Sequence, residues 1–320
     1  MDNIETRIYL FTGFLESGKT TFANDTIVNT NFCEDERTVL IATEEGEVEY
    51  DAKQLKEHNT DYVEVEDIET LKDTAFWHDL KEKYQPTQVL VEYNGMWDVP
   101  TFMNAPFPKG WDIVQILTTI DASKFTYFVN NTNMRSYLFQ HCSQSDLIIF
   151  NRIEGVKKSF MRNNIKAMNQ QAQIIYEKSD GSIDNSMQDE LPYDYNADEF
   201  DVADHDFGIF CYDVMEHPER YANKKVRIKG KFIGKDKVRK NGFILGRYAM
   251  VCCEQDTSLI GMLVESEPEI INQFIPNEWL IIEGHTTSDY DPELQMPVIT
   301  LHAENIEVTK PLDYEYVTFD

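Results

Sequence analysis

The chain has 320 residues, 42% of them hydrophobic, and a formal net charge of −28. This length suits two domains. No apolar run approaches the roughly 18 to 20 residues that a membrane span requires, so the composition indicates a globular protein. The acidic charge disfavours direct binding to nucleic acid or to anionic lipid.

The N-terminus and the cysteines favour a cytoplasmic location. The first residues, MDNIETR, contain neither the basic nor the apolar region of a secretory signal. The five cysteines are odd in number and include the adjacent pair Cys252-Cys253, unlike the even set of a secreted disulfide scaffold. We therefore expect reduced thiols.

The first half of the chain alternates β-rich and helical patterns, which predicts an α/β fold with a mostly parallel sheet covered by helices. The expected strands lie near residues 7–12, 38–42, 62–65, 88–92, 113–119, 146–150 and 173–176. The expected helices cover residues 18–29, 50–58, 67–83, 123–143 and 156–169.

The first of these strands leads into a phosphate-binding motif. The run RIYLFTGFLESGKTT, residues 7–21, contains G-x-x-x-x-G-K-[ST] at every fixed position. Gly13 and Gly18 permit the sharp turns that bring backbone N–H groups close to phosphate, and the following helix directs its positive end at the anion. Lys19 is placed to reach the β- and γ-phosphates, and the Thr20 hydroxyl to bind Mg²⁺. This stretch therefore predicts a P-loop.

An acidic loop, TEEGEVEYD, follows the second predicted strand at residues 43–51. It lies at the carboxyl end of a strand, where α/β sheets bind their ligands. Two interpretations remain open. The loop is either a switch whose carboxylates, Glu44 among them, approach Mg²⁺, or an ordinary solvated loop.

The strand QVLVE, residues 88–92, ends in Glu92. An acid at this point is placed to hold Mg²⁺ directly or through water. Gly95 follows closely and can present its N–H to a γ-phosphate. These residues predict a second element on the phosphate side of the site.

A motif for the base follows the strand DLIIF, residues 146–150. Asn151-Arg152-Ile153-Glu154 has the form N-[KR]-x-[DE]. A carboxylate at Glu154 can accept hydrogen bonds from the ring N–H and the exocyclic amino group of guanine, whereas adenine offers no matching pair of donors. The motif argues for GTP.

In order and spacing, residues 1 to about 180 resemble the CobW-type family of P-loop GTPases. GFLESGKTT resembles that family's GFLGSGKTT, TEEGEVEYDA its N-E-x-G-x-x-x-x-D-A, and VLVEYNGMWDVP its V-E-T-x-G-x-x-x-P. LTTIDASKF, DLIIFNRIE and MNQQAQIIY are similar to three further segments. The resemblance implies slow, Mg²⁺-dependent GTP hydrolysis and a role as a nucleotide-dependent chaperone or insertase for zinc, cobalt and related ions.

These patterns and the resemblance together assign roles to individual residues. Lys19 and Glu92 would act in catalysis, Thr20 and Glu92 would bind Mg²⁺, and Glu44 would approach it. The nucleotide would be bound by Gly13, Glu16, Ser17, Gly18, Lys19, Thr20, Thr21, Gly95, Asn151, Arg152 and Glu154.

Two departures from the family pattern limit what is carried over. Arg152 stands where the family has a lysine and Glu154 where it has an aspartate, so we expect a weakened selectivity for guanine. The family's metal-binding C-x-C-C is replaced by EDIETL at residues 66–71. Without cysteine there, the GTPase core cannot carry a soft metal in the family's way.

The composition shifts after Lys178. Residues 179–206 contain ten Asp or Glu and no Lys or Arg, which predicts an acidic linker between a GTPase domain at 1–178 and a second domain at 207–320. The second domain has the pattern of an all-β module, with a short helix near residues 214–222 and a hairpin turn at Asn241-Gly242.

Residues 224–240 hold nine basic side chains. A basic face on a small barrel could bind nucleic acid. However, Phe232 is the run's one aromatic residue and the chain is acidic. We favour a solvated strand face that answers the acidic linker.

Cys252 and Cys253 allow two interpretations. Neighbouring residues on a strand point to opposite faces, so at most one faces a given site, and a pair of small buried thiols is one possibility. The other is a thiolate site for a soft metal such as Zn²⁺, with Asp256 nearby and His285 or His302 arriving from another strand.

Residues 223–317 resemble the C-terminal domain of a family of bacterial two-helix membrane proteins that occur beside permeases. The similar segments are NKKVRIKGKFI, FILGRYAMVCCEQD, WLIIEGH and PVITLHAENIE, with Gln255 in place of that family's alanine. The resemblance implies an OB-like barrel and a transport-linked context. The membrane helices of that family have no counterpart here, so we expect no direct membrane insertion.

Together these patterns predict a two-domain GTPase whose nucleotide state controls docking or delivery in metal homeostasis. GTP and Mg²⁺ would be its ligands, Zn²⁺ a candidate cargo, and a metal-receiving or permease-associated protein its partner. The alternative is a non-catalytic GTP-binding adaptor or regulator that docks on a permease or another protein.

Overall fold

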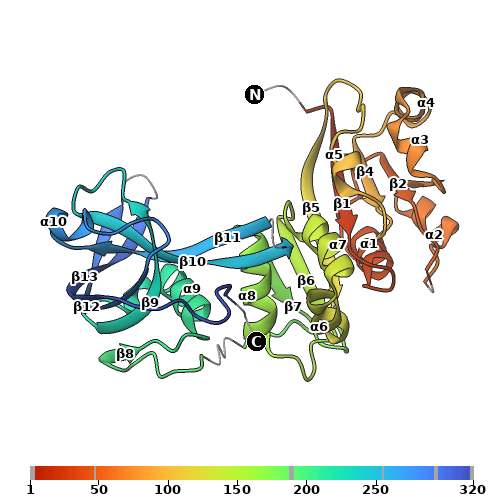
Figure 1. Ribbon diagram of the computed structural model, residues 1–320. Coiled ribbons are helices and arrows are strands. Elements are labelled where there is room, and N and C mark those ends of the chain that lie inside the picture. The colour runs from red at the N-terminus through yellow and green to blue at the C-terminus, as the bar shows by residue number, and fades with distance from the viewer. Residues whose placement is uncertain (1–3, 47, 187–190, 254–255, 292–294, 318–320) are drawn as a thin grey trace. The chain divides into compact units, whose positions relative to one another are not determined.

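The computed structural model describes residues 4–46, 48–186, 191–253, 256–291 and 295–317, and for residues 250–253 and 256 it describes the backbone alone. The chain divides into two compact units, Met1–Met187 and Gln188–Asp320, whose elements are shown in Figure 1. The division falls inside the acidic range 179–206.

The first unit contains a seven-stranded sheet in the order β3-β2-β4-β1-β5-β6-β7, and all neighbouring strands are parallel. Its strands are β1 (Thr6–Thr12), β2 (Thr38–Ala42), β3 (Thr60–Glu64), β4 (Gln88–Glu92), β5 (Trp111–Asp121), β6 (Leu147–Asn151) and β7 (Gln173–Tyr176). Each strand overlaps its predicted range, and the predicted α/β class is confirmed.

The helices of this unit include two pairs where the sequence predicts single long helices. They are α1 (Lys19–Val28), α2 (Ala52–Glu57), α3 (Ile68–Lys72), α4 (Thr74–Tyr84), α5 (Val99–Met103), α6 (Ala122–Asn130), α7 (Thr132–Cys142) and α8 (Lys158–Met168). Asp73 separates α3 from α4 and accepts the N–H of Ala75, and Asn131 separates α6 from α7 and accepts the N–H of Asn133. Such short polar side chains begin a new helix by satisfying its free donors.

Side chains of the central strands alternate between the two faces of the sheet. On one face Ile8 and Leu10 pack with Trp77 of α4, and on the other Phe11 packs with Ile27 of α1. Helices therefore cover both faces, as a parallel sheet requires.

The parallel arrangement also brings the carboxyl ends of the strands to one edge. Because β2, β4, β1, β5 and β6 are consecutive neighbours, the loops that follow them begin side by side. This is the edge at which α/β sheets bind ligands.

The second unit contains a five-stranded barrel in the cyclic order β9-β10-β11-β13-β12, closed by pairing of β9 with both β10 and β12. Its strands are β9 (Lys225–Lys235), β10 (Gly242–Cys253), β11 (Asp256–Glu265), β12 (Trp279–Asp291) and β13 (Met296–Val308). The β11–β13 pair is parallel and the other pairs of the barrel are antiparallel. This is an OB-type barrel, and the predicted class is confirmed. A short strand, β8 (Glu199–Asp201), pairs with the start of β9.

The predicted helix near residues 214–222 is wrong in position. The helix α9 spans Phe207–Glu216 and is followed by a 3₁₀ turn, Pro218–Arg220. Phe207, Phe210 and Val214 form a buried stripe at helical spacing, and Pro218 cannot continue an α-helix. A four-residue helix, α10 (Pro268–Ile271), was not predicted. The β9–β10 hairpin is present, but its loop spans residues 236–241 and Gly242 already belongs to β10.

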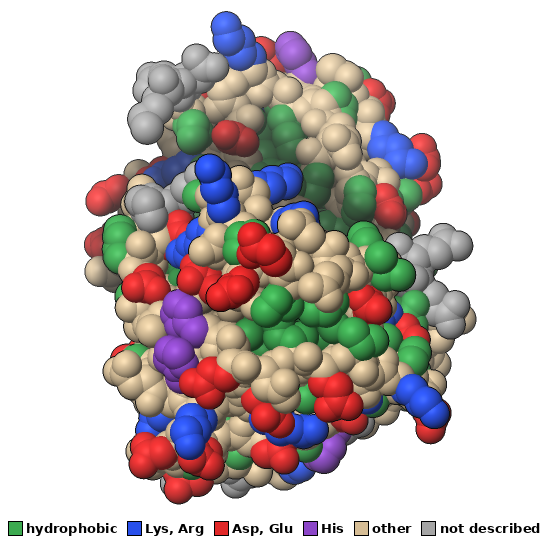
Figure 2. All heavy atoms as spheres, turned by 60° about the vertical axis from the view of Figure 1, so that its left-hand side comes forward, with side chains coloured by type: hydrophobic (Ala, Val, Ile, Leu, Met, Phe, Trp, Pro, Cys, Tyr) green, Lys and Arg blue, Asp and Glu red, His purple; other side chains and the backbone are tan. Residues whose placement is uncertain are grey.

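Basic side chains of residues 224–240 lie against acidic ones. Three of them pair with acids of the range 179–206, in the ion pairs Lys224–Asp198, Lys225–Glu199 and Arg227–Asp201. Acidic and basic side chains are interspersed on the face shown in Figure 2. This pairing supports the solvated strand face that the sequence favours over a nucleic-acid surface.

Candidate functional site

The loop between β1 and α1 requires glycine at two positions. Gly13 has a φ of 130°, and a Cβ there would lie 2.3 Å from the carbonyl oxygen of Thr119. Gly18 caps α1 with a φ of 99°, and a Cβ there would lie 2.6 Å from Nδ2 of Asn151. Both the backbone conformation and the space exclude larger residues.

Lys19, the first residue of α1, folds back over this loop. Its Nζ donates to the carbonyl oxygens of Gly13 at 2.8 Å and Phe14 at 2.9 Å and forms an ion pair with Glu44. The residue is only 3% exposed. A buried ammonium is therefore fixed at the base of the loop.

The end of β4 meets the start of α1 through Glu92. Oε1 of Glu92 accepts the Thr20 hydroxyl at 2.5 Å, and Oε2 accepts the Tyr50 hydroxyl at 2.6 Å. Burial raises the pKa of the Glu92 carboxyl, and the two hydroxyl donors partly oppose that shift. The hydroxyl of Thr20 and the carboxylate of Glu92 are hard oxygen ligands, a donor set that fits Mg²⁺.

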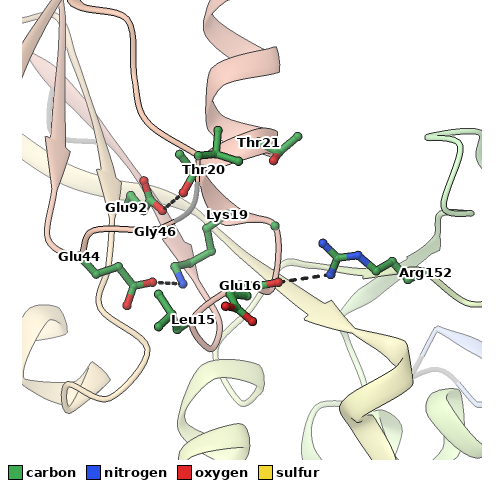
Figure 3. A pocket seen from close by; sticks show the side chains of 11 residues that line it. Leu15, Glu16, Lys19, Thr20, Thr21, Glu44, Gly46, Glu92 and Arg152 are labelled. Atoms are coloured by element: carbon green, nitrogen blue, oxygen red, sulfur yellow. Dashed lines mark hydrogen bonds and ion pairs between the residues drawn. The ribbon is translucent and has the colours of Figure 1, made fainter.

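Gly95 and Glu44 come together beside Lys19. The N–H of Gly95 donates to Oε2 of Glu44 at 3.2 Å. A Cβ on Gly95 would lie 2.5 Å from the carbonyl oxygen of Gly13, so this loop and the P-loop pack backbone to backbone. Figure 3 shows Glu44 directed at Lys19 while Thr20 is directed at Glu92.

The motif after β6 makes contacts both with the P-loop and away from it. Nδ2 of Asn151 donates to the carbonyl oxygen of Ser17 at 2.6 Å. Arg152 donates to Oδ2 of Asp121 at 2.9 Å. The exposed carboxylate of Glu154 accepts the N–H and the hydroxyl of Ser179, which lower the pKa of Glu154.

A cavity of about 80 Å³ lies among these groups, small beside the roughly 300 to 1,000 Å³ of typical ligand sites. Its lining comprises Leu15, Glu16, Gly18, Lys19, Thr20, Thr21, Glu44, Gly46, Val48, Glu92 and Arg152. Other residues that the sequence assigns to the nucleotide do not line it: Gly13, Ser17, Gly95, Asn151 and Glu154.

Sequence reasoning missed three residues that contact the candidate site. They are Tyr50, Ser179 and His141, the last of which donates from Nε2 to the carbonyl oxygen of Gly95 at 3.0 Å. Burial lowers the pKa of His141 to about 4, so the ring is neutral at pH 7. No spacing in the sequence signals these contacts, because each joins residues that are far apart in the chain.

The soft-metal hypothesis for the second unit meets a geometric obstacle. The backbone of Cys252 and Cys253 ends β10, where Cys253 pairs with Asp256 at the start of β11, and the side chains of both cysteines lie outside the described residues. His302 pairs with Glu265 at the other end of β11, roughly 30 Å away at the usual strand rise. His285 lies opposite His302. These pairings place the two histidines at the end of β11 away from Cys253. The soft-metal hypothesis at Cys252 and Cys253, whose side chains lie outside the described residues, stays a prediction.

Two features are absent from the described residues. No group of three or more His, Cys, Asp or Glu is placed to hold a metal ion within the parts of the chain that are described. Across the same ranges, no helix has both the length and the apolar character to cross a membrane.

A parallel sheet, a glycine-turned loop after its first strand and a buried lysine at the start of the next helix define a P-loop nucleotide-binding domain. The chain belongs to the CobW/HypB/UreG family, whose nucleotide-binding domain matches residues 7–176. Residues 177–318 match the DUF1980 C-terminal domain. Both resemblances seen in the sequence are thus confirmed.

The solved structures similar to this chain are distant. The crystal structure of hydrogenase maturation factor HypB from Archaeoglobus fulgidus is 17% identical, with 56% of this chain and 84% of that chain covered and a TM-score of 0.41. Mitochondrial single-stranded DNA binding protein Rim1 from S. cerevisiae is 13% identical, with 28% and 96% covered and a TM-score of 0.20. A comparison with curated proteins gave no match. Function is not transferred from either structure at these scores.

Proposed function

We propose that the first unit binds GTP together with Mg²⁺ and hydrolyses it slowly. The observation that carries this proposal is the buried ammonium of Lys19 beside the Thr20–Glu92 hydrogen bond, at the edge where the parallel strands end. A fixed cation and a hard oxygen pair at a helix N-terminus are the elements that a triphosphate and its metal ion require.

The phosphate side of the site is assigned to the P-loop and its neighbours. Lys19 and the N–H of Gly95 would bind the terminal phosphate. As the bond between the terminal phosphate and the β-phosphate breaks, Lys19 would stabilise the negative charge on the phosphate oxygens. Thr20 and Glu92 would hold Mg²⁺, which when bound neutralises phosphate charge.

The base side is assigned to the motif after β6. Because the N–H and hydroxyl of Ser179 orient the Glu154 carboxylate, that carboxylate is suited to accept the two donors on guanine. Asn151 ties this motif to the P-loop through the carbonyl of Ser17. Arg152 donates to the carboxylate of Asp121, which leaves the aliphatic part of the Arg152 side chain as a candidate surface for the base.

A binding experiment with the full-length protein tests the proposal. Fluorescent GTP and GDP are titrated with Mg²⁺ present, and ATP is added as a competitor. We expect Lys19→Ala to weaken binding by about ten- to a hundred-fold, because a buried charge-assisted contact is lost. Lys53→Ala, a control at an 87% exposed side chain of α2, should bind as the wild type does.

Three measurements, of binding, of competition by ATP and of phosphate release, decide between the alternatives. Equal binding by Lys19→Ala and wild type, or equal competition by ATP and GTP, would contradict the proposed site. Phosphate release above that of Lys19→Ala supports a GTPase, whereas tight binding without release supports the adaptor.

Membership of the family extends the proposal to a metal-related role, in which GTP state controls docking or delivery. Zinc titration of the reduced protein, with GDP and with a non-hydrolysable GTP analogue, tests this role. The zinc affinity of the wild type is compared with that of the Cys252→Ser/Cys253→Ser variant. Nucleotide-dependent binding that needs the cysteines supports delivery. Weak zinc binding that is unchanged in the cysteine variant would contradict a role in zinc delivery.

A further inference from the structure

The phosphate side of the candidate site already contains an anion that the chain itself supplies. Glu44, in the loop after β2, forms an ion pair with Nζ of Lys19 and accepts the N–H of Gly95 at 3.2 Å. The two side chains of the ion pair are 2% and 9% exposed. The contact is therefore enclosed, unlike the solvated surface ion pairs that contribute little.

The hydrogen-bonding capacity of Lys19 is fully used in this arrangement. An ammonium has three N–H donors. Two of them serve the carbonyl oxygens of Gly13 and Phe14, and the third faces Glu44. A second anion cannot occupy the position of Glu44 on Lys19 unless Glu44 leaves.

A second residue of the same loop, Tyr50, contacts the metal side of the site. The Tyr50 hydroxyl donates to Oε2 of Glu92, while Thr20 donates to Oε1. Residues 44 and 50 thus contact the two groups assigned to the terminal phosphate and to the metal ion. The small volume of the cavity, about 80 Å³, agrees with a site that this loop fills.

We propose that Glu44 is an internal competitor of the terminal phosphate and thereby sets the preference of the site between nucleoside tri- and diphosphates. The inference rests on the proposed function for the identity of the ligand. A carboxylate and a terminal phosphate present the same kind of oxygen acceptor to Lys19 and Gly95, so only one of them can be bound there.

The consequence differs between the two nucleotides. A diphosphate lacks the group that would take the place of Glu44 against Lys19 and the N–H of Gly95. Its β-phosphate competes with the Gly13 and Phe14 carbonyls for Lys19 and leaves Glu44 in position. A triphosphate displaces Glu44, and since Tyr50 belongs to the same loop, its hydrogen bond to Glu92 is disturbed with it. Loop 43–51 therefore has one position with diphosphate and another with triphosphate. Of the two interpretations of this loop, a switch or an ordinary solvated loop, the proposal favours the switch.

Two glutamates of this loop provide a matched test. Glu44→Gln removes the competing charge, whereas Glu45→Gln removes the same charge from an exposed neighbour. GDP and a non-hydrolysable GTP analogue are titrated into the full-length protein with Mg²⁺. We expect Glu44→Gln to bind the analogue about tenfold more tightly and GDP within about twofold of wild type, and Glu45→Gln to change both nucleotides alike.

The outcomes separate this proposal from the proposed function. A wild type that binds neither nucleotide overturns both. If the wild type binds both nucleotides but Glu44→Gln does not tighten the analogue relative to GDP, the competition alone is overturned. It is overturned equally if Glu45→Gln tightens the analogue relative to GDP as much as Glu44→Gln does.

A second measurement needs no variant. Hydrogen exchange of peptides covering residues 43–51 should change when the analogue is added and stay unchanged with GDP. The same exchange with both nucleotides would contradict a displacement by the terminal phosphate.

Discussion

Ser179 donates both its backbone N–H and its hydroxyl to the carboxylate of Glu154, each at a donor–acceptor distance of 2.7 Å. The two residues follow different strands of the parallel sheet, β7 and β6, and meet because those strands are neighbours. The contact lowers the pKa of Glu154 and fixes an exposed carboxylate in one orientation. Ser179 is therefore a positioning residue for the base-reading acid that we propose.

Removal of the Ser179 hydroxyl should relax the preference for guanine. Ser179→Ala leaves the backbone donor but frees one carboxylate oxygen, so we expect the GTP-to-ATP affinity ratio to fall by about three- to tenfold. Competition titrations on the full-length protein give the ratio. Ser182→Ala is the control, because the Ser182 hydroxyl donates to Asp180 instead. An unchanged GTP-to-ATP affinity ratio in Ser179→Ala would show that the Ser179 hydroxyl does not contribute to the selection of the base.

His141 should make the protein sensitive to mild acid. Burial is the main cause that lowers its pKa to about 4 from 6.5, and the charge of Lys19 adds to it. Between those values the unfolded chain binds a proton that the folded chain excludes, so stability is fully present above about pH 6.5 and is lost as the pH falls towards 4.

The variant His141→Gln isolates this term, because glutamine can still donate to the Gly95 carbonyl and does not titrate. Between pH 7 and pH 5 the wild type should lose on the order of 2 kcal/mol more unfolding free energy than the variant. Urea unfolding at the two pH values measures the difference. Equal losses in the two proteins would show that His141 is not the responsible group.

Arg247 should be a stabilising cation of the barrel. The residue is 3% exposed, and its guanidinium donates to the carbonyl oxygens of Asp204, Glu315 and Tyr316, which ties the C-terminal segment to β10. Arg247→Lys keeps the charge but cannot reach three carbonyls from one planar group. We expect a loss on the order of 3 kcal/mol.

Arg227→Lys is the matched control. Its side chain is 45% exposed and pairs with Asp201 and Glu283 at the surface, so the change should stay within about 0.5 kcal/mol. Hydrogen exchange of peptides from the second unit in denaturant assigns each effect to that unit. Similar losses in the two variants would contradict a special role for Arg247.

The sequence predicts the parts of the fold and site that depend on local spacing. The P-loop follows β1 within a few residues, and Glu92 closes a short buried strand, so both are visible as patterns. The contacts of Glu44 with Lys19 and of Tyr50 with Glu92 depend on the path of a loop, which no period encodes. Helix α5 has five residues, too few for a helical pattern to appear.

The three residues of β8 determine where the second unit can be cut from the chain. β8 covers the edge of β9 at Lys225–Arg227, while the pairs between β9 and β10 begin only at Lys231. A fragment that starts at residue 207 would leave this edge bare, and a bare strand edge recruits strands from other molecules. A fragment that starts at residue 191 retains a short edge strand whose first and last residues, Glu199 and Asp201, carry charges that discourage such addition. The longer fragment should remain monomeric in solution, and the shorter one should self-associate.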